Sequence, residues 1–193
     1  MIFSIPNLKK YLENKWVNCL CFEHTILLTE KVVDYLLNKH QLKIIEKQYF
    51  TNHSIFYRCI KDNFINASQI TLKNEYNENK KLFQSMQKFY KDKIAYLNTK
   101  MKDYGNVYLF GAHIFSQYLI YRGLQLDKIK MILDNNLNKH KKRLYGTNLW
   151  VDSPEILKDD SNALVILNAG IYNDEIERGI MKLNNNTKVV KCH

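Results

Sequence analysis

One stretch, residues 107–136, constrains the fold more than any other part of the chain. It contains, in order, an apolar strand, a glycine turn, a helix, a second strand and an acid, at Val107–Phe110, Gly111, 117–122, 129–133 and Asp134. This order is typical of the first half of a doubly wound, Rossmann-like sheet. Asp134 follows Gly111 at close to the ~20 residues at which such folds place a ribose-binding acid. The sequence therefore predicts an α/β fold with a parallel sheet.

The glycine motif of a tight dinucleotide site is incomplete in this stretch. In a G-x-G-x-x-G motif the glycines let a pyrophosphate approach the backbone, but here His113 and Ser116 replace the second and third glycine. The imidazole would crowd a dinucleotide. Two interpretations stay open. The helix N-terminus could hold a phosphate or diphosphate loosely, or His113 caps the helix or lines the pocket rim while Asp134 ends a strand.

The rest of the C-terminal half continues the α/β pattern. We expect a basic loop over 139–145 and strands at Leu149–Val151, Ala163–Leu167 and 188–190. We also expect a helix that starts at Ser153 with Pro154 in its first turn, and a second helix that is capped by Asn173 and continues through Ile180. Ligands of open α/β sheets bind at the carboxyl ends of the strands. The candidate substrate-binding residues there are Gly111, His113, Asp134, Asn135, Asn168 and Tyr172.

The first 61 residues predict a smaller sheet with one helix. The expected elements are a strand from Met1 that ends at Pro6, an irregular segment over Leu8–Trp16, a helix over Glu30–Lys39 capped by Thr29, and two strands, Lys43–Tyr49 and Ser54–Ile60. The chain begins directly on an apolar strand, as though preceding strands were missing. We therefore expect a partial sheet in this half.

A polar segment and a long helix link the two halves. Residues 62–71 predict a hinge, and Leu72–Lys102 contains neither glycine nor proline and has apolar residues at helical spacing. The helix is either a spacer packed along both lobes or a dimerising coiled coil. The lysines at 93 and 100 interrupt its heptads. A homodimer therefore stays an open expectation.

Composition argues against several other classes of protein. The net charge of +10 comes almost entirely from dispersed lysines, which favours a solvated surface over a nucleic-acid interface. Neither a membrane-spanning run nor a signal peptide is apparent, so we expect a soluble, cytoplasmic protein. The four cysteines lack zinc-site spacing and are expected to be reduced thiols, so no metal site is predicted.

Two sets of short motifs, in a fixed order, resemble one known family. The first set is Ile2–Leu8, Phe22–Thr25, Leu28–Thr29 and Phe50–Phe56, and the second is Phe110–Ala112, Ile132–Asn135, Asn138–Lys139, Gly146–Thr147, Ser153–Pro154 and Asp174–Ile176. The first resembles the last third of a class I S-adenosylmethionine-dependent methyltransferase domain, most closely the sugar C-methyltransferases that act on nucleotide-linked deoxysugars. The second resembles the Rossmann-like C-terminal domain of that family.

The resemblance implies roles for four residues of the first half. The catalytic Glu-His dyad of the family corresponds to Glu23 and His24, and its His-Gly-Gly-Ser turn corresponds to His53 and Ser54. Sugar C-methylation needs a base to remove the proton next to a keto group, and an imidazole oriented by a carboxylate suits that step. His24 is then the base or acid, and Glu23 orients it. The alternative stays open that Glu23 is solvated and His24 hydrogen-bonds within its own loop.

The chain departs from the family where the methyl donor binds. Cys21 replaces a tyrosine of the family, and the two glycines before Ser54 are absent. The sequence before residue 105 also lacks a G-x-G-x-G loop and a cysteine-rich zinc module. We therefore expect S-adenosylmethionine to serve the complete enzyme without binding this chain alone. We therefore expect the chain to be inactive by itself, as a fragment, as a decayed or split gene product, or as one partner of a two-chain enzyme whose other chain is the missing N-terminal methyltransferase half.

Three segments follow from these expectations. Residues 1–61 are the last strands and helix of a partial class I methyltransferase-like sheet, 62–104 are a hinge and long linking helix, and 105–193 are a Rossmann-like lobe. The expected function is the C-terminal portion of a methyltransferase that acts on a nucleotide-linked sugar or similar small metabolite. The alternative is a non-catalytic module that binds a nucleotide or nucleotide-sugar.

Overall fold

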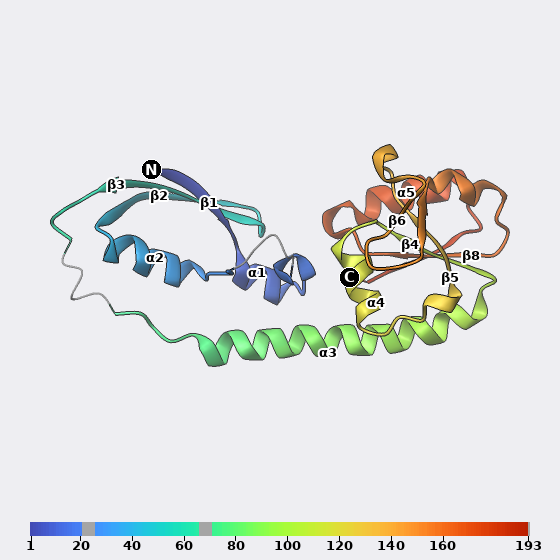
Figure 1. Ribbon diagram of the computed structural model, residues 1–193, viewed down its shortest axis with the longest axis horizontal. Helices are drawn as coiled ribbons and strands as arrows, with labels where there is room; N and C mark the ends of the chain where they lie inside the picture. The colour runs from blue at the N-terminus through green and yellow to red at the C-terminus, as the bar shows by residue number, and fades with distance from the viewer. Residues whose placement is uncertain (21–25, 66–70, 193) are drawn as a thin grey trace. The chain divides into compact units, whose positions relative to one another are not determined.

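The computed structural model describes residues 1–20, 26–65 and 71–192, which form two compact units (Figure 1). Unit 1 comprises Met1–Gln87 and unit 2 comprises Lys88–His193. Each unit has its own sheet and its own apolar core. No helix within the described ranges is long and apolar enough to cross a membrane.

Unit 1 is built on a three-stranded antiparallel sheet. Its elements are β1 (Ile2–Pro6), α1 (Leu8–Glu13), the 3-10 helix η1 (Val17–Leu20), α2 (Glu30–Lys39), β2 (Leu42–Phe50) and β3 (Ser54–Lys61). The strands lie in the order β1-β3-β2, so β3 is central. One face of the sheet packs against α2, where Val33 and Leu37 meet Ile55 and Tyr57. The predicted strands and the helix at Glu30–Lys39 are confirmed.

One local prediction in unit 1 is wrong, and a second is confirmed only in part. Leu8–Trp16 is not irregular, because α1 forms there with the Asn7 side chain accepting a hydrogen bond from the Lys10 N–H at 3.3 Å. Thr29 precedes α2 as predicted, but its side chain makes no capping bond. The Thr29 hydroxyl donates instead to the Glu75 carboxylate at 3.0 Å. The Asn7 side chain starts α1, and the Glu75 side chain takes the hydrogen bond of Thr29. The sequence pattern alone does not give the position of either side chain.

The long helix is shorter than the sequence predicted. Helix α3 spans Tyr76–Lys100 rather than Leu72–Lys102, and the short 3-10 helix η3 (Met101–Asp103) follows it. The Asn74 side chain accepts a hydrogen bond from the Tyr76 N–H at 2.9 Å, and this local bond sets the start of the helix. Part of the predicted hinge, 66–70, lies outside the described residues.

Unit 2 is built on a six-stranded sheet. Its elements are β4 (Asn106–Phe110), α4 (Ile114–Tyr121), η4 (Leu126–Lys128), β5 (Ile129–Leu133), η5 (Leu137–Lys139), β6 (Lys142–Arg143), β7 (Trp150–Asp152), η6 (Pro154–Asp159), β8 (Ala163–Leu167), η7 (Gly170–Tyr172), α5 (Asn173–Leu183) and β9 (Lys188–Lys191). The strand order is β6-β7-β5-β4-β8-β9, and every neighbouring pair except β6–β7 is parallel. The predicted α/β, Rossmann-like fold is confirmed.

The order of the strands identifies the switch point of the sheet. From β4 the chain runs outward through β5 to β7, and then crosses to β8 on the other side of β4. Every residue of β8 is buried, as expected for a central parallel strand covered on both faces. Figure 1 shows α4 and α5 on opposite faces of the sheet, and η6 packs against α5. Ligands in open α/β sheets bind beside such a switch point.

Several element boundaries in unit 2 differ from the prediction. Helix α4 begins at Ile114, earlier than predicted, because His113 caps it. The basic loop contains the short strand β6, and the segment after Ser153 is the 3-10 helix η6 rather than an α-helix. Asn173 is not the cap of α5 but its first residue, and its side chain accepts a hydrogen bond from the Ala169 N–H at 2.7 Å.

Candidate functional site

The turn after β4 is closed by bonds within the chain. Gly111 has φ of +102°, a left-handed conformation that favours glycine. Its N–H donates to the Leu133 carbonyl at 2.7 Å, and its carbonyl accepts from the Ser116 hydroxyl at 2.5 Å. The turn therefore ties β4 to the end of β5 and to the first turn of α4.

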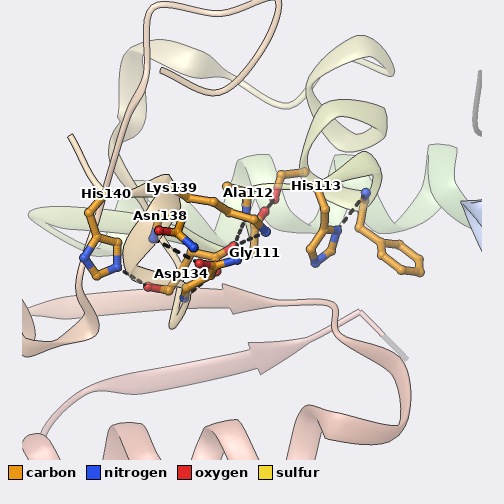
Figure 2. Close-up of polar contacts among 10 residues, drawn as sticks. Gly111, Ala112, His113, Asp134, Asn138, Lys139 and His140 are labelled. Carbon is orange, nitrogen blue, oxygen red and sulfur yellow. Dashed lines mark hydrogen bonds and ion pairs between the residues drawn. The ribbon is translucent and has the colours of Figure 1, made fainter. Parts of the chain in front are cut away.

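Asp134 joins that turn to the loop after β5. Its Oδ2 accepts hydrogen bonds from the Ala112 N–H at 2.8 Å and from the Lys139 ammonium at 2.9 Å. Its Oδ1 accepts from the Asn136 N–H at 2.9 Å. Burial raises the pKa of Asp134, but these donors outweigh it and hold the pKa below its usual value. Figure 2 shows this carboxylate linked to both segments, so it acts as a clamp within the protein.

His113 fills the space beside the turn. Its Nδ1 accepts a hydrogen bond from the Phe115 N–H at 3.2 Å and so caps α4 (Figure 2). A Cβ placed on Gly111 would collide with the imidazole ring, so the ring lies against the glycine. Burial, with the nearby Lys139 charge, lowers the pKa of His113, although Asp134 opposes the shift. The neutral ring is the form that can accept the capping bond.

The remaining predicted residues of unit 2 have separate surroundings. Asn135 is exposed, and Tyr172 is 58% exposed in η7. Asn168 follows β8 and is only 2% exposed, yet neither its amide nitrogen nor its amide oxygen has a hydrogen-bond partner among the described residues. The six residues lie after the strands as predicted, but only Asn135 lines the pocket described next.

A pocket of about 510 Å³ lies between the strand ends and the helix α5. Its walls contain Phe110 from β4, Ser153 and Pro154 at the start of η6, and Ile176 and Ile180 of α5. This position is on the α5 face of the sheet, away from the closed turn at Gly111. The sequence did not predict these lining residues. The pattern that could have indicated them is the apolar face of α5, which has basic residues beside it.

Charged groups surround the apolar part of this pocket. Arg178 and Lys182 project from α5, and Glu175 lies on the same helix. The Arg178 Nε donates to the Asp174 carbonyl at 3.2 Å, while Lys182 forms no ion pair with a described residue. On the opposite wall Glu155 is paired with Lys158. The pocket thus offers two cations and one unpaired carboxylate around an apolar floor.

The Asp134 clamp supports one wall of the pocket. His140 lines the pocket and its Nε2 forms a 2.7 Å hydrogen bond with the Asp134 carbonyl (Figure 2). Leu137, on the same loop, lines the pocket too. Asp134, which the sequence predicted to bind substrate, instead fixes the loop that carries these two residues. It is a positioning residue for the pocket.

Unit 1 has a pocket of its own, of about 720 Å³. It lies beside the end of β1 and the start of α2, and its lining includes Asn7, Thr29, Glu30 and Tyr49. The Glu30 carboxylate accepts from the Tyr49 hydroxyl at 2.7 Å and from Lys47 at 2.8 Å. Within the lining, Lys10 pairs with Glu13 and Lys31 pairs with Glu75.

The predicted residues of unit 1 are only partly described. His53 Nδ1 and the Ser54 hydroxyl form a 2.6 Å hydrogen bond, and the His53 ring lies 5.6 Å from the Tyr11 ring. Glu23 and His24 lie outside the described residues. Among the described residues, no cluster of three or more His, Cys, Asp and Glu side chains could hold a metal ion. Cys19, Cys59 and Cys192 are buried free thiols.

Two comparisons with known proteins bear on this chain. A family model described as the C-methyltransferase C-terminal domain matches residues 65–190. The match includes nearly all of unit 2 and therefore the closed turn, the Asp134 clamp and the pocket beside α5. A comparison with curated proteins gave no match.

Proposed function

The chain belongs to the family of C-methyltransferase C-terminal domains, and on that premise we propose that unit 2 holds the substrate of a methyltransferase, a nucleotide-linked sugar or a similar small anionic metabolite. The observation that carries this proposal is the pocket beside α5. It lies at the carboxyl ends of β4, β5 and β7, next to the switch point of the sheet. Its volume of about 510 Å³ falls within the usual range for small-molecule sites.

The chemistry of the lining matches the three parts of such a ligand. Arg178 and Lys182 supply charged donors for a diphosphate. The Glu175 carboxylate can accept hydrogen bonds from the hydroxyl groups of a ribose or sugar. Phe110, Ile176 and Ile180 form an apolar surface for the planar base or the sugar ring.

The methyl donor does not fit the residues of this chain. All six glycines of the sequence lie at or after Gly105. The glycine turn between β4 and α4, at Gly111, is filled by the His113 ring and bonded to the Asp134 clamp. We therefore place S-adenosylmethionine on a separate methyltransferase domain. In this proposal His24 removes a proton next to the keto group of the sugar and Glu23 orients the imidazole.

The binding proposal is tested by thermal unfolding and calorimetry with UDP-glucose, dTDP-glucose and GDP-mannose. A ligand bound only by the folded protein raises the unfolding midpoint, and we expect that rise with at least one of the three. Arg178→Ala and Lys182→Ala should each weaken the affinity by about 10- to 100-fold. Lys188→Ala is the matched control, because Lys188 is exposed in the same unit but lies outside the pocket. Unchanged affinity in both pocket variants would contradict the proposal.

The catalytic part is tested in the complete enzyme. His24→Ala should lower turnover by about two orders of magnitude or more, the usual contribution of a general base, and leave the nucleotide-sugar affinity unchanged. His40→Ala is the control, since His40 only ends α2. Turnover equal to wild type would remove the dyad from the mechanism and leave unit 2 as a binding module. S-adenosylmethionine itself should not stabilise the isolated chain, and a raised midpoint would show that its site is here after all.

A further inference from the structure

His140 lines the pocket beside α5 with one ring nitrogen already bonded to the backbone. The side chain is half-buried, and its Nε2 lies 2.7 Å from the Asp134 carbonyl (Figure 2). A carbonyl can only accept a hydrogen bond, so Nε2 carries the hydrogen. In the neutral ring the other nitrogen, Nδ1, is then an acceptor with a lone pair. Nδ1 has no hydrogen-bond partner among the described residues, so it is the ring atom that a ligand can use.

The charges around His140 favour an anionic partner for Nδ1. The loop that carries it contains the basic run Lys139–Arg143. Lys141 is exposed and forms no ion pair within the part of the chain that the structure describes. Arg178 and Lys182 line the same pocket from α5. The carboxylate of Asp134 is already bound by a lysine of the loop. A phosphate is therefore better matched to this wall of the pocket than a neutral hydroxyl group.

We propose that the diphosphate of the nucleotide-linked sugar binds to Nδ1 of His140, and that the ring takes up a proton from the solvent as it binds. This inference rests on the function proposed above and adds one residue and one proton to it. The imidazolium donates from both nitrogens, with Nε2–H to the Asp134 carbonyl and Nδ1–H to a phosphate oxygen. The neutral ring would instead set its lone pair against the anion. Arg178 and Lys182 contact the same diphosphate from α5.

Among the described groups around this pocket, His140 alone changes charge between pH 6 and pH 8. Carboxylates, ammonium groups and guanidinium groups keep their charge in this range. The charged residues on the elements around His140 are Asp134, Lys139 and Lys141 of its own loop, Asp152 and Glu155 of β7 and η6, and Glu175, Arg178 and Lys182 of α5. His113, on the other side of the Asp134 clamp, stays mostly neutral because burial lowers its pKa. The phosphates of a nucleotide-sugar carry one charge each throughout this range.

The test is isothermal titration calorimetry of the full chain with UDP-glucose, dTDP-glucose and GDP-mannose. Titrations in Tris and in HEPES, whose ionisation enthalpies differ, give the number of protons taken up per ligand bound. At pH 8 we expect close to one proton, because the ring is neutral before the ligand binds. The Kd should rise about 10- to 30-fold from pH 6 to pH 8, since the neutral ring must first be protonated.

Two substitutions assign the proton to this ring. His140→Gln keeps a side-chain N–H for the Asp134 carbonyl but does not titrate, so its affinity should stay constant between pH 6 and pH 8 without proton uptake. His140→Arg carries a permanent charge, and it should bind without proton uptake and more tightly than His140→Gln at pH 8. His40→Gln, at the end of α2, is the matched control and should behave as wild type. Circular dichroism and the unfolding midpoint check that each variant is folded. If His140→Gln does not fold, His140→Arg answers the same question.

The outcomes separate this inference from the proposed function. If wild type binds a nucleotide-sugar without proton uptake, the inference is overturned and the proposed function stands, because Nδ1 would then accept from a ligand hydroxyl or face no ligand atom. Proton uptake that persists in His140→Gln overturns the inference too, since another group would titrate. If none of the three nucleotide-sugars binds at pH 6 or pH 8, the proposed function fails and the inference fails with it.

Discussion

The two sheets of this protein differ in how far the chain itself covers them. In unit 2 the central strand β8 is buried along its whole length, and helices lie on both faces of the sheet. In unit 1 helix α2 covers one face, while Ile2, Phe56 and Ile60 remain exposed on the other. The sheet of unit 2 is thus covered on both faces, whereas the sheet of unit 1 has apolar side chains exposed on one face. Stability should therefore reside in unit 2, and new contacts should form at unit 1.

The sharpest test of this difference is a cavity in the unit 2 core. Leu133 is fully buried among Tyr108, Phe110 and Val165, so Leu133→Ala should lower the free energy of unfolding of unit 2 by about 2–5 kcal/mol. Trp16 and Trp150 are the two tryptophans of the chain, one in each unit. Denaturant unfolding in a Trp16→Phe background therefore follows unit 2 by fluorescence. Leu126→Ala, at an exposed position, is the control, and a loss below about 1 kcal/mol in Leu133→Ala would contradict the comparison.

A smaller loss should follow when the clamp of unit 2 is weakened. Asp134→Asn keeps the shape of the side chain but removes the charge that binds Lys139 and the Ala112 N–H. Hydrogen bonds to charged groups contribute about 1.5–3 kcal/mol to the free energy of unfolding. Because Lys139 is half-exposed, we expect the loss in Asp134→Asn to be at the lower end of this range. The same variant should weaken nucleotide-sugar binding, because the loop that carries Leu137 and His140 loses the ion pair between Lys139 and the Asp134 carboxylate. Asp127→Asn, exposed in η4, should have no effect on either measurement.

The fold of unit 2 could be predicted from sequence because its signals are local. The apolar run Ala163–Leu167 and the glycine at 111 identify a buried parallel strand and a strand-to-helix turn. The location of the pocket was not predictable in the same way. It depends on the face of the sheet that η6 and α5 share, which follows from the crossover between β7 and β8. The residue pattern of a single helix or strand does not show which face of the sheet η6 and α5 will cover.

The role of Asp134 shows a second limit of the sequence. Its spacing from Gly111 predicted a ribose-binding acid, and spacing alone cannot show that Lys139 and the Ala112 N–H already bind its carboxylate. His113 is the converse case, because one of its sequence interpretations was the helix cap that the structure contains. An acid or histidine at a motif position identifies a location on the fold, and its partners decide what it does there.

The cap on α4 should give unit 2 a pH dependence. The pKa of His113 is lowered in the folded protein, so the unfolded chain takes up the proton first. The stability that His113 contributes is complete above the unfolded pKa of about 6.5 and is lost as the pH falls toward the folded pKa. His113→Asn keeps a capping oxygen without a titrating group. Unfolding of the Trp16→Phe variant from pH 8 to pH 5 should show the decline, and His113→Asn should make it shallower. An equal slope in both proteins would assign the pH dependence to other groups.

The smallest effect is expected on the uncovered face of unit 1. Ile60 is 50% exposed on β3, so Ile60→Ser removes little buried apolar surface and should change the free energy of unfolding by no more than about 0.5 kcal/mol. Cys59, its neighbour, points to the α2 face and is buried, so Cys59→Ser at the adjacent position should cost more, because it introduces a hydroxyl into an apolar core. Fluorescence of Trp16 in a Trp150→Phe background measures both. A large loss from Ile60→Ser in dilute solution would mean that this face is already covered within a single chain, and the difference between the two sheets would then disappear.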